Sequence, residues 1–223
     1  MLNIGEIQTL LNTIDNRKAQ AKVGRRYYHA AHDIQDYRLF YYDAFGELRE
    51  DHTRSNIKIA HPFFTELVDQ EIQYLLSNRD RIVTAEDAEL QKEMDRYFNE
   101  NDRFRAELAD ACTDAVVCGW GWLYAYVDTD GRLSFQCADS LSVTEADGRY
   151  TSDGRDYVLY RYLQRKDIYG HMVYKIMVMD DNQTWMYTQV DSGTITLDAS
   201  TADAPNPRPH VLYKKHNSDD TYF

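Results

Sequence analysis

The sequence lacks the features that mark secreted, membrane-spanning and P-loop proteins. Its three cysteines, Cys112, Cys118 and Cys137, form no paired framework and have no metal-site spacing, which fits a reducing compartment. No signal peptide is expected at the N-terminus, and no run of about 18 apolar residues predicts a membrane span. The patterns GxxxxGK[ST], GxSxG and HExxH are also absent, so the sequence gives no support for P-loop, nucleophile-elbow or zincin chemistry.

Basic residues are scarce relative to acidic ones. Lys and Arg total 25 against 37 Asp and Glu, which gives a formal net charge of −12. This balance argues against a protein that grips nucleic acid by neutralising phosphates. The single positive run, residues 17–26, is predicted to be a solvated helix face. With 43% hydrophobic and 13% aromatic residues, the chain has ample material for a packed core.

The first half of the chain has the apolar spacing of helices. One helix is expected over residues 4–14, with a continuation toward Tyr37 in which Gly24 is a weak point or break. Another is expected after a capping box formed by Thr84 and Asp87. A further helix should begin near residues 101–102 and end at Gly119, a favourable C-cap.

Residues 56–76 contain the widest apolar stripe. Pro62 fits the first position of a helix, where its missing N–H is not needed. The apolar side chains that follow at helical spacing are Phe63, Phe64, Leu67, Val68, Ile72, Leu75 and Leu76. Because only a narrow polar face remains, this helix is predicted to sit between two neighbouring elements.

From Gly121 onward the apolar period changes from 3.6 to 2, which predicts strands. The expected strands are 122–127, 133–137, 141–144, 157–164, 172–179, 184–190 and 194–197, with another starting at 211 after a proline-rich linker at 202–209. Short connections favour an antiparallel meander whose central members, 157–164 and 172–179, are apolar on both faces. Residues 39–45 could add a short strand before a charged loop at 47–55. The predicted fold is α+β, with N-terminal helices packed on an antiparallel β-meander.

Candidate catalytic and metal-binding residues have weak support. His29 and His32 would share a helix face beside Asp33, but no third ligand stands at a supporting spacing, so surface histidines are the favoured interpretation. Asp128 and Asp130 resemble the start of a calcium loop, yet a hairpin turn explains both. No catalytic, cofactor-binding or metal-ligating residue is predicted, and no cofactor.

Tyrosine is abundant, with 18 residues. Strand propensity accounts for most of them. Of those outside the predicted sheet, five near the N-terminus suggest an additional contact surface, since tyrosine is also favoured at protein interfaces: Tyr27, Tyr28, Tyr37, Tyr41 and Tyr42.

Three segments, taken in order, resemble the Gp6-like (SPP1-type) family of tailed-bacteriophage portal proteins. Residues 27–34, YYHAAHDI, are similar to the family signature YYxGxHDI, with Ala30 in place of glycine. Residues 56–76 resemble its proline-phenylalanine helix, and residues 118–131 its helix, glycine, aromatic strand and Asp-Gly hairpin. The order and spacing of the three make the resemblance specific, and it extends from about residue 17 to 223.

The resemblance implies a non-enzymatic structural protein that forms a homo-oligomeric ring at one capsid vertex, through which DNA is packaged and ejected. It implies as partners other copies of the chain, the terminase large subunit, capsid and scaffolding proteins, a head–tail adaptor and double-stranded DNA passing without sequence-specific binding. No membrane is implied. The protein would be assembled in the host bacterial cytoplasm and reside in the virion.

Matched to the family layout, the chain corresponds to an N-terminal wing portion. It divides into a helical arm and connecting segment (1–55), a helical part (56–120), a sheet part (121–200), and a linker with the start of a further region (201–223). Stem, clip and crown would follow Phe223, so a truncated chain is expected, and part of the apolar stripe on 62–76 should be exposed or covered by another copy.

Two other functions stay open on the residues alone. One is a metal-dependent hydrolase or nuclease that uses carboxylates with His29 or His32. The other is a protein-interaction module unrelated to phage. The hydrolase alternative can be tested by mutating His32 to alanine and by measuring divalent-metal binding. The unrelated interaction module can be told from a portal protein by the neighbouring genes, since terminase and head-morphogenesis genes would indicate a portal protein.

Overall fold

The computed structural model describes residues 2–13, 16–77, 82–127, 131–180 and 183–198, together with the backbone of residues 211–216. The predicted turn at Asp128 and Asp130 and the linker at 202–209 lie outside the described residues. The helices of the described part are α1 (Ile4–Asn12), α2 (Asn16–Tyr28), α3 (Phe63–Leu76), α4 (Ala88–Met94) and α5 (Asp102–Cys118). Among them, none combines the length and apolar character that crossing a membrane requires.

The helix ends follow local side-chain chemistry. Asn3 and Glu6 form a reciprocal capping box at α1, and Asn101 caps α5. Gly119 ends α5 in the left-handed conformation with φ 89°, as predicted. The predicted capping box at Thr84 is wrong: Asp87 itself caps α4, because its carboxylate accepts from the backbone N–H groups of the first turn.

The strands form antiparallel sheets, and the predicted α+β fold with helices before a meander is confirmed. The strands are β1 (Phe40–Tyr42), β2 (Leu48–Glu50), β3 (Trp120–Val127), β4 (Leu133–Ala138), β5 (Val143–Ala146), β6 (Tyr157–Lys166), β7 (Met172–Met179), β8 (Thr184–Val190), β9 (Ile195–Leu197) and β10 (Val211–His216). The structure adds that the meander is divided. Strands β5 to β9 form a five-stranded sheet in sequence order, while β3 pairs with β4 on one side and with β10 on the other.

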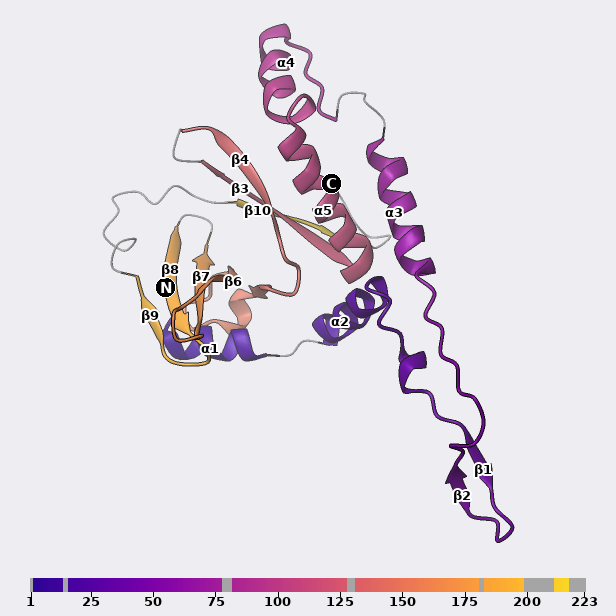
Figure 1. The fold of residues 1–223 in the computed structure, drawn as a ribbon. Coiled ribbons are helices and arrows are strands. Elements are labelled where there is room, and N and C mark those ends of the chain that lie inside the picture. The colour runs from indigo at the N-terminus through magenta and orange to yellow at the C-terminus, as the bar shows by residue number, and fades with distance from the viewer. Residues whose placement is uncertain are drawn as a thin grey trace.

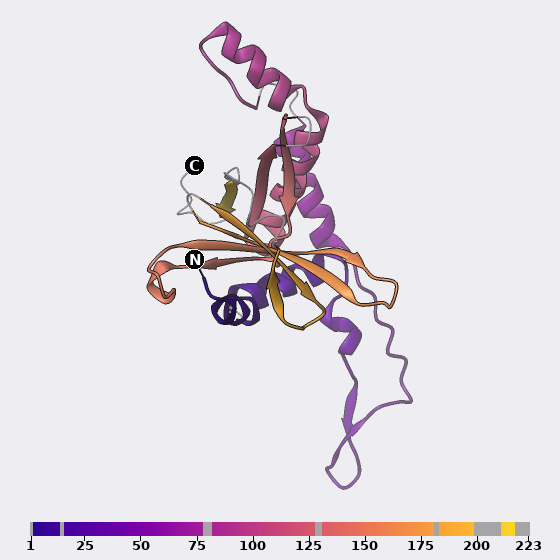
Figure 2. The same cartoon turned by 90° about the vertical axis from the view of Figure 1, so that its left-hand side faces the viewer.

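The body of the molecule is layered. Helix α1 covers one face of the five-stranded sheet, where Leu2 and Ile7 pack with Leu159 and Ile176. The opposite face packs on the three-stranded sheet through a second cluster that contains Trp122, Tyr124, Tyr160 and Met177. Figure 2 shows the five-stranded sheet between these two neighbours. Both faces of β7 and of residues 157–162 of β6 are therefore covered, and the strand order confirms their predicted central place.

Three helices form the remaining layer. Helix α5 packs on β3 and β4 and carries α2 and α3 on its other side, around a cluster that includes Ala21, Val68, Ile72, Cys112 and Val117 (Figure 1). The prediction that Gly24 weakens or breaks the N-terminal helix is wrong, since α2 runs through it. A Cβ on Gly24 would lie 2.1 Å from the carbonyl oxygen of Val117, so glycine lets α2 and α5 approach closely.

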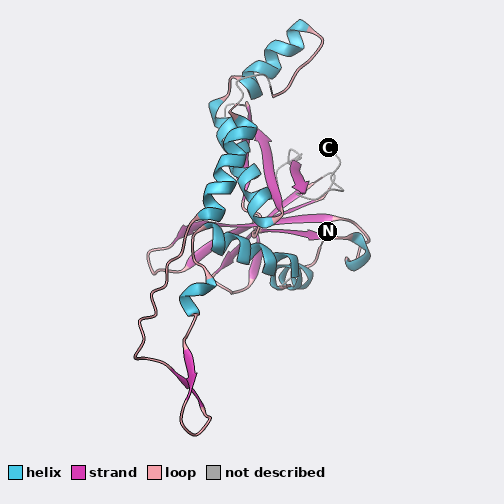
Figure 3. Ribbon diagram, turned by 90° about the vertical axis from the view of Figure 1, so that its right-hand side faces the viewer, coloured by secondary structure: helices cyan, strands magenta, loops and turns pink. Residues whose placement is uncertain are grey.

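Residues 29–62 leave this body as a long projection, called here the arm (Figure 1 and Figure 3). It contains one 3₁₀ turn (Asp33–Asp36) and the hairpin β1–β2. Strand β2 corrects the prediction of a charged loop over residues 47–55: Phe40 pairs with Glu50 and Tyr42 with Leu48. The break between α1 and α2 and the end of α2 at Tyr28 also shorten the helix that was predicted to continue toward Tyr37.

Candidate assembly surface

Exposed apolar side chains gather on the arm and the helix that follows it. More than half of the large exposed apolar residues of the described part lie between Ile34 and Leu75. The most exposed within this segment are Phe45 at 89%, Tyr74 at 87%, Ile57 at 79% and Tyr42 at 74%. A concentration of exposed apolar side chains of this kind is typical of a surface that binds another protein.

Helix α3 divides its apolar stripe between the body and solvent. Val68 and Ile72 are buried against α2 and α5, whereas Phe63, Leu67 and Leu75 are exposed. Pro62 is the residue before the helix, one position earlier than predicted. Helix α3 thus contacts two neighbours, α2 and α5, as predicted, but they cover less of its apolar stripe than a narrow polar face would require. The prediction that part of its stripe is exposed is confirmed.

The end of α2 is tied to α3 at the base of the arm. The Tyr28 hydroxyl donates to the Asp69 carboxylate at 2.8 Å, and the Thr65 hydroxyl donates to the Tyr28 carbonyl. One residue earlier, the Tyr27 hydroxyl donates to Asp33 at 2.7 Å. These bonds give the two tyrosines of the YYHAAHDI segment a structural role, because they fix the position at which the arm leaves the body.

Ala30 turns the chain out of α2. Its φ is 56°, in the left-handed region. The Ala31 N–H donates to the Arg26 carbonyl, and the Ala30 N–H donates to the Tyr27 carbonyl. These two bonds form a Schellman motif, in which glycine is the preferred residue at the left-handed position. The structure thus explains why the family pattern has glycine where this chain has Ala30.

His29 and His32 are not brought together on a helix face. Helix α2 ends at Tyr28, so His29 lies in the turn, where its ring contacts Tyr28 edge-on, and the His32 ring stacks on Tyr27 at 4.8 Å. Among the described residues, no three of His, Cys, Asp and Glu lie close enough together to hold a metal ion. The part of the chain that the structure describes gives no support to the hydrolase or nuclease alternative.

A charged network holds the other side of α2. Arg25 forms ion pairs with Asp139 and, at 3.0 Å, with Asp114 of α5. Asp114 also accepts from the Ser140 backbone N–H at 3.0 Å, and the Ser140 hydroxyl donates to the Trp120 carbonyl at 2.7 Å. The predicted solvated face is thus only partly solvated, because Arg25 joins α2 to α5 and to the β4–β5 connection.

The cysteines have the environment of structural residues. Cys112 and Cys118 are buried, and Cys137 is half-buried, with no disulfide among them. Burial raises the pKa of the Cys118 thiol and raises the pKa of Cys137 to about 12. Neither thiol is activated as a nucleophile at neutral pH.

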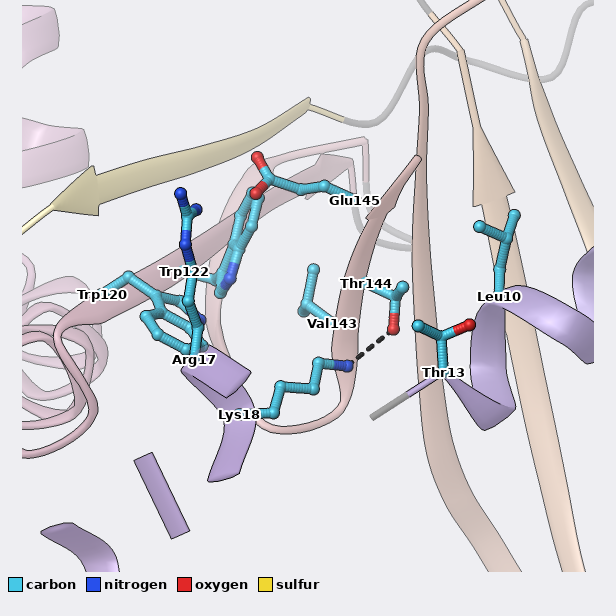
Figure 4. Close-up of a pocket in the computed structure, with 9 residues that line it drawn as sticks. All are labelled: Leu10, Thr13, Arg17, Lys18, Trp120, Trp122, Val143, Thr144 and Glu145. Atoms are coloured by element: carbon cyan, nitrogen blue, oxygen red, sulfur yellow. Dashed lines mark hydrogen bonds between the residues drawn. The ribbon is translucent and has the colours of Figure 1, made fainter. Parts of the chain in front are cut away.

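A pocket of about 320 Å³ opens where α1, α2 and strands β3 and β5 meet (Figure 4). Its wall is apolar, from Leu10, Trp120, Trp122 and Val143, and its rim is polar, from Thr13, Arg17, Lys18, Thr144 and Glu145. The Lys18 ammonium donates to the Thr144 hydroxyl at 2.7 Å. Sequence reasoning missed this pocket, since its walls come from segments more than a hundred residues apart.

Comparison with known proteins shows the family to which the chain belongs. Residues 7–221 match the phage portal protein family, SPP1 Gp6-like, and the chain belongs to that family. It is similar to the portal protein of Bacillus phage SPP1, with 29% identity over 194 residues. That alignment covers 84% of this chain and 36% of the SPP1 protein, so the chain spans about a third of its relative's length.

Proposed function

We propose that this chain is a structural subunit of a portal ring, at the capsid vertex through which phage DNA is packaged and ejected. The family match over residues 7–221 carries the proposal. The exposed apolar surface on the arm and α3 supports it, because a ring subunit must present surfaces that only its neighbours cover. The division of the wing portion into segments 1–55, 56–120, 121–200 and 201–223 belongs to this proposal.

The proposed role is non-enzymatic. A terminase large subunit would supply ATP hydrolysis, and the absence of a P-loop sequence fits that division of labour. Capsid protein, scaffolding protein and a head–tail adaptor would be the other partners, with assembly in the host cytoplasm and residence in the virion. These assignments come from the family.

The net charge of −12 is consistent with a channel subunit past which DNA moves with little electrostatic attraction. Each cation placed against a phosphate releases counterions and adds grip, so a channel that lets DNA move should have few such contacts. Double-stranded DNA would then pass without sequence-specific binding.

Self-association of the purified chain tests the proposal. We expect sedimentation velocity to show association that rises with protein concentration, and Leu67→Asp on the exposed face of α3 to weaken it at least tenfold. Ile168→Asp is the matched control, because Ile168 is 91% exposed in the β6–β7 turn, on a different part of the molecule. A chain that stays monomeric at every concentration, or loses association equally in both variants, would contradict the proposal.

A further inference from the structure

The tip of the arm is a fixed apolar projection. Phe45 stands at the turn between β1 and β2 and is 89% exposed. The Asp43 carboxylate holds the turn from inside: it accepts from the backbone N–H groups of Phe45 at 2.8 Å and Glu47 at 3.0 Å, and pairs with Arg49 at 2.6 Å. The Phe45 ring is therefore presented by an ordered turn, which lowers the entropy lost when it binds.

Nothing in the described part of the chain covers this hairpin. Every residue of β1 is exposed, and β2 is exposed except for the partly covered Glu50. A two-stranded hairpin without a packed face is marginal in water. Its aromatic side chains gain stability only when a second surface removes them from solvent.

The pocket beside Trp120 has the properties that such a tip requires. Its volume of about 320 Å³ exceeds that of one aromatic side chain, and its wall is apolar and aromatic. Two cations, Arg17 and Lys18, stand on its rim with one carboxylate, Glu145 (Figure 4). The arm tip has the opposite balance, since its two carboxylates, Asp43 and Glu47, outnumber the one cation beside them, Arg49.

The pocket and the arm lie at opposite ends of α2. Arg17 and Lys18 belong to its first turn, while the arm leaves after Tyr28, its last residue. A helix of 13 residues is about 20 Å long. Each copy therefore presents a projection and a pocket on different surfaces, which is the arrangement of a head-to-tail contact that can close into a ring.

We propose that Phe45 at the arm tip of one copy inserts into the Trp120 pocket of the next copy. The inference rests on the proposed ring function and names the two surfaces that meet. The partner is a second copy of this chain, and the acidic turn of one copy faces the basic rim of the other. The arm thereby gains the packed neighbour that its own body does not supply.

Cross-linking between two single-cysteine-addition variants tests the contact. Ala44→Cys and Thr13→Cys place new thiols beside Phe45 at the tip and on the pocket rim, in exposed positions that leave the core and the Phe45 ring intact. The native thiols are buried or half-buried, with raised pKa values for Cys118 and Cys137, so they compete poorly. When the two variants are mixed under mild oxidation, we expect disulfide-linked pairs that contain one copy of each.

A matched mixture of Ile168→Cys with Thr13→Cys controls for chance collisions, because Ile168 is also exposed at another hairpin turn. We expect the first mixture to exceed the control at least tenfold in mixed product. In addition, Phe45→Ser should weaken self-association at least tenfold, whereas Phe45→Trp should retain it and Ile168→Ser should leave it unchanged.

The outcomes separate this inference from the proposed function. If the wild-type chain self-associates but the Ala44→Cys and Thr13→Cys mixture gives no more product than the control, the inference is wrong and the ring proposal stands. The same holds if peptide mapping finds Ala44→Cys linked to itself or to a different surface. If the wild-type chain never associates and no mixed product forms, both are wrong.

Discussion

The five-stranded sheet and the arm both contain tyrosine-rich antiparallel hairpins, but their side chains have different surroundings. Tyr157 and Tyr187 in the sheet are almost fully buried, because α1 and the strands beside them remove their rings from water. Tyr41 and Tyr42 in the arm are exposed. The contrast shows that strand propensity and tyrosine content do not decide burial; a second layer does. Among the described residues, the five-stranded sheet has a second layer within one copy, and the arm has none.

Hydrogen exchange should give the largest difference between the two regions. Backbone amides that pair within the β1–β2 ladder should exchange near the rate of local opening, because no packed layer resists opening there. Amides of β7, paired on both sides and buried, should open only with global unfolding, about 5–15 kcal/mol uphill. Mass spectrometry on dilute monomer would measure both. If the arm and β7 are equally protected in the monomer, the two regions do not differ in packing. If the arm becomes protected only at high protein concentration, a second copy covers it.

Two identical substitutions should differ by several kcal/mol. Ile176→Ala removes a fully buried side chain of β7 and should destabilise the chain by about 2–5 kcal/mol. Ile57→Ala removes an exposed side chain of the arm and should change stability by less than about 0.5 kcal/mol. Urea unfolding followed by tryptophan fluorescence reports on the body, where Trp120, Trp122 and Trp185 all lie. A similar loss for both variants would show that the arm packs on its own body.

Arg25→Gln probes the junction between the body and the α2 layer. It leaves the carboxylates of Asp114 and Asp139 without their shared guanidinium, which should cost about 1.5–3 kcal/mol. Arg149→Gln is the control, since its ion pair with Asp147 is exposed to solvent and should contribute much less to stability. Thermal unfolding of both variants gives the comparison, and equal effects would argue that the Arg25 network adds no more than a surface pair.

Ala30→Gly should stabilise the exit of the arm. The left-handed φ of 56° strains any residue with a Cβ, so glycine should gain up to about 1 kcal/mol after its larger entropy loss is subtracted. Ala31→Gly, beside it, is the control and should not stabilise. Unfolding midpoints in urea measure the difference. A loss of stability in Ala30→Gly would mean that the turn is not left-handed in solution.

The smallest effect should be a pH dependence at the β6–β7 and β8–β9 turns. His171 pairs with Asp191 at 2.7 Å, and this hydrogen bond raises the pKa of the exposed His171. The Asp191 pKa is lowered, first by the Met172 backbone N–H and then by His171. The pair should stabilise the turns in mildly acidic solution, lose that contribution as pH rises through the raised His171 pKa, and lose it again as pH falls through the lowered Asp191 pKa. Comparison with His171→Gln over this range checks the sign, and a difference that grows above neutral pH would contradict it.

Much of the body could be predicted from sequence because its pattern is local. Strands β7 and β8 begin and end at the predicted residues, since continuous apolar segments are bounded by turn-forming residues there. Helix α5 ends at Gly119 for the same reason. The division of the meander into two sheets could not be predicted. Whether β5 pairs with β4 or with β6 alone is decided by packing between layers, which the local sequence does not encode.

The arm and the pocket were harder to predict. Strand β2 reads Leu-Arg-Glu, without an apolar period, and forms only because it pairs with β1. The end of α2 has neither glycine nor proline, so the left-handed turn at Ala30 could not be predicted from sequence. For the same reason, His29 and His32 were predicted to share one helix. The tyrosines outside the sheet did point to a contact surface, which stays a prediction. No sequence pattern indicated the pocket, because its residues, such as Lys18 and Thr144, are brought together only by the tertiary fold.

The pairing of β10 with β3 has a consequence for synthesis and for shortened pieces of the chain. Strand β3 (Trp120–Val127) is made some ninety residues before β10, and the whole five-stranded sheet is inserted between them. Until residues 211–216 leave the ribosome, the outer edge of a strand with sequence WGWLYAYV has no partner. Open, aromatic strand edges are the usual starting points of aggregation. A fragment that ends before residue 211 should therefore be much less soluble than one that includes this strand.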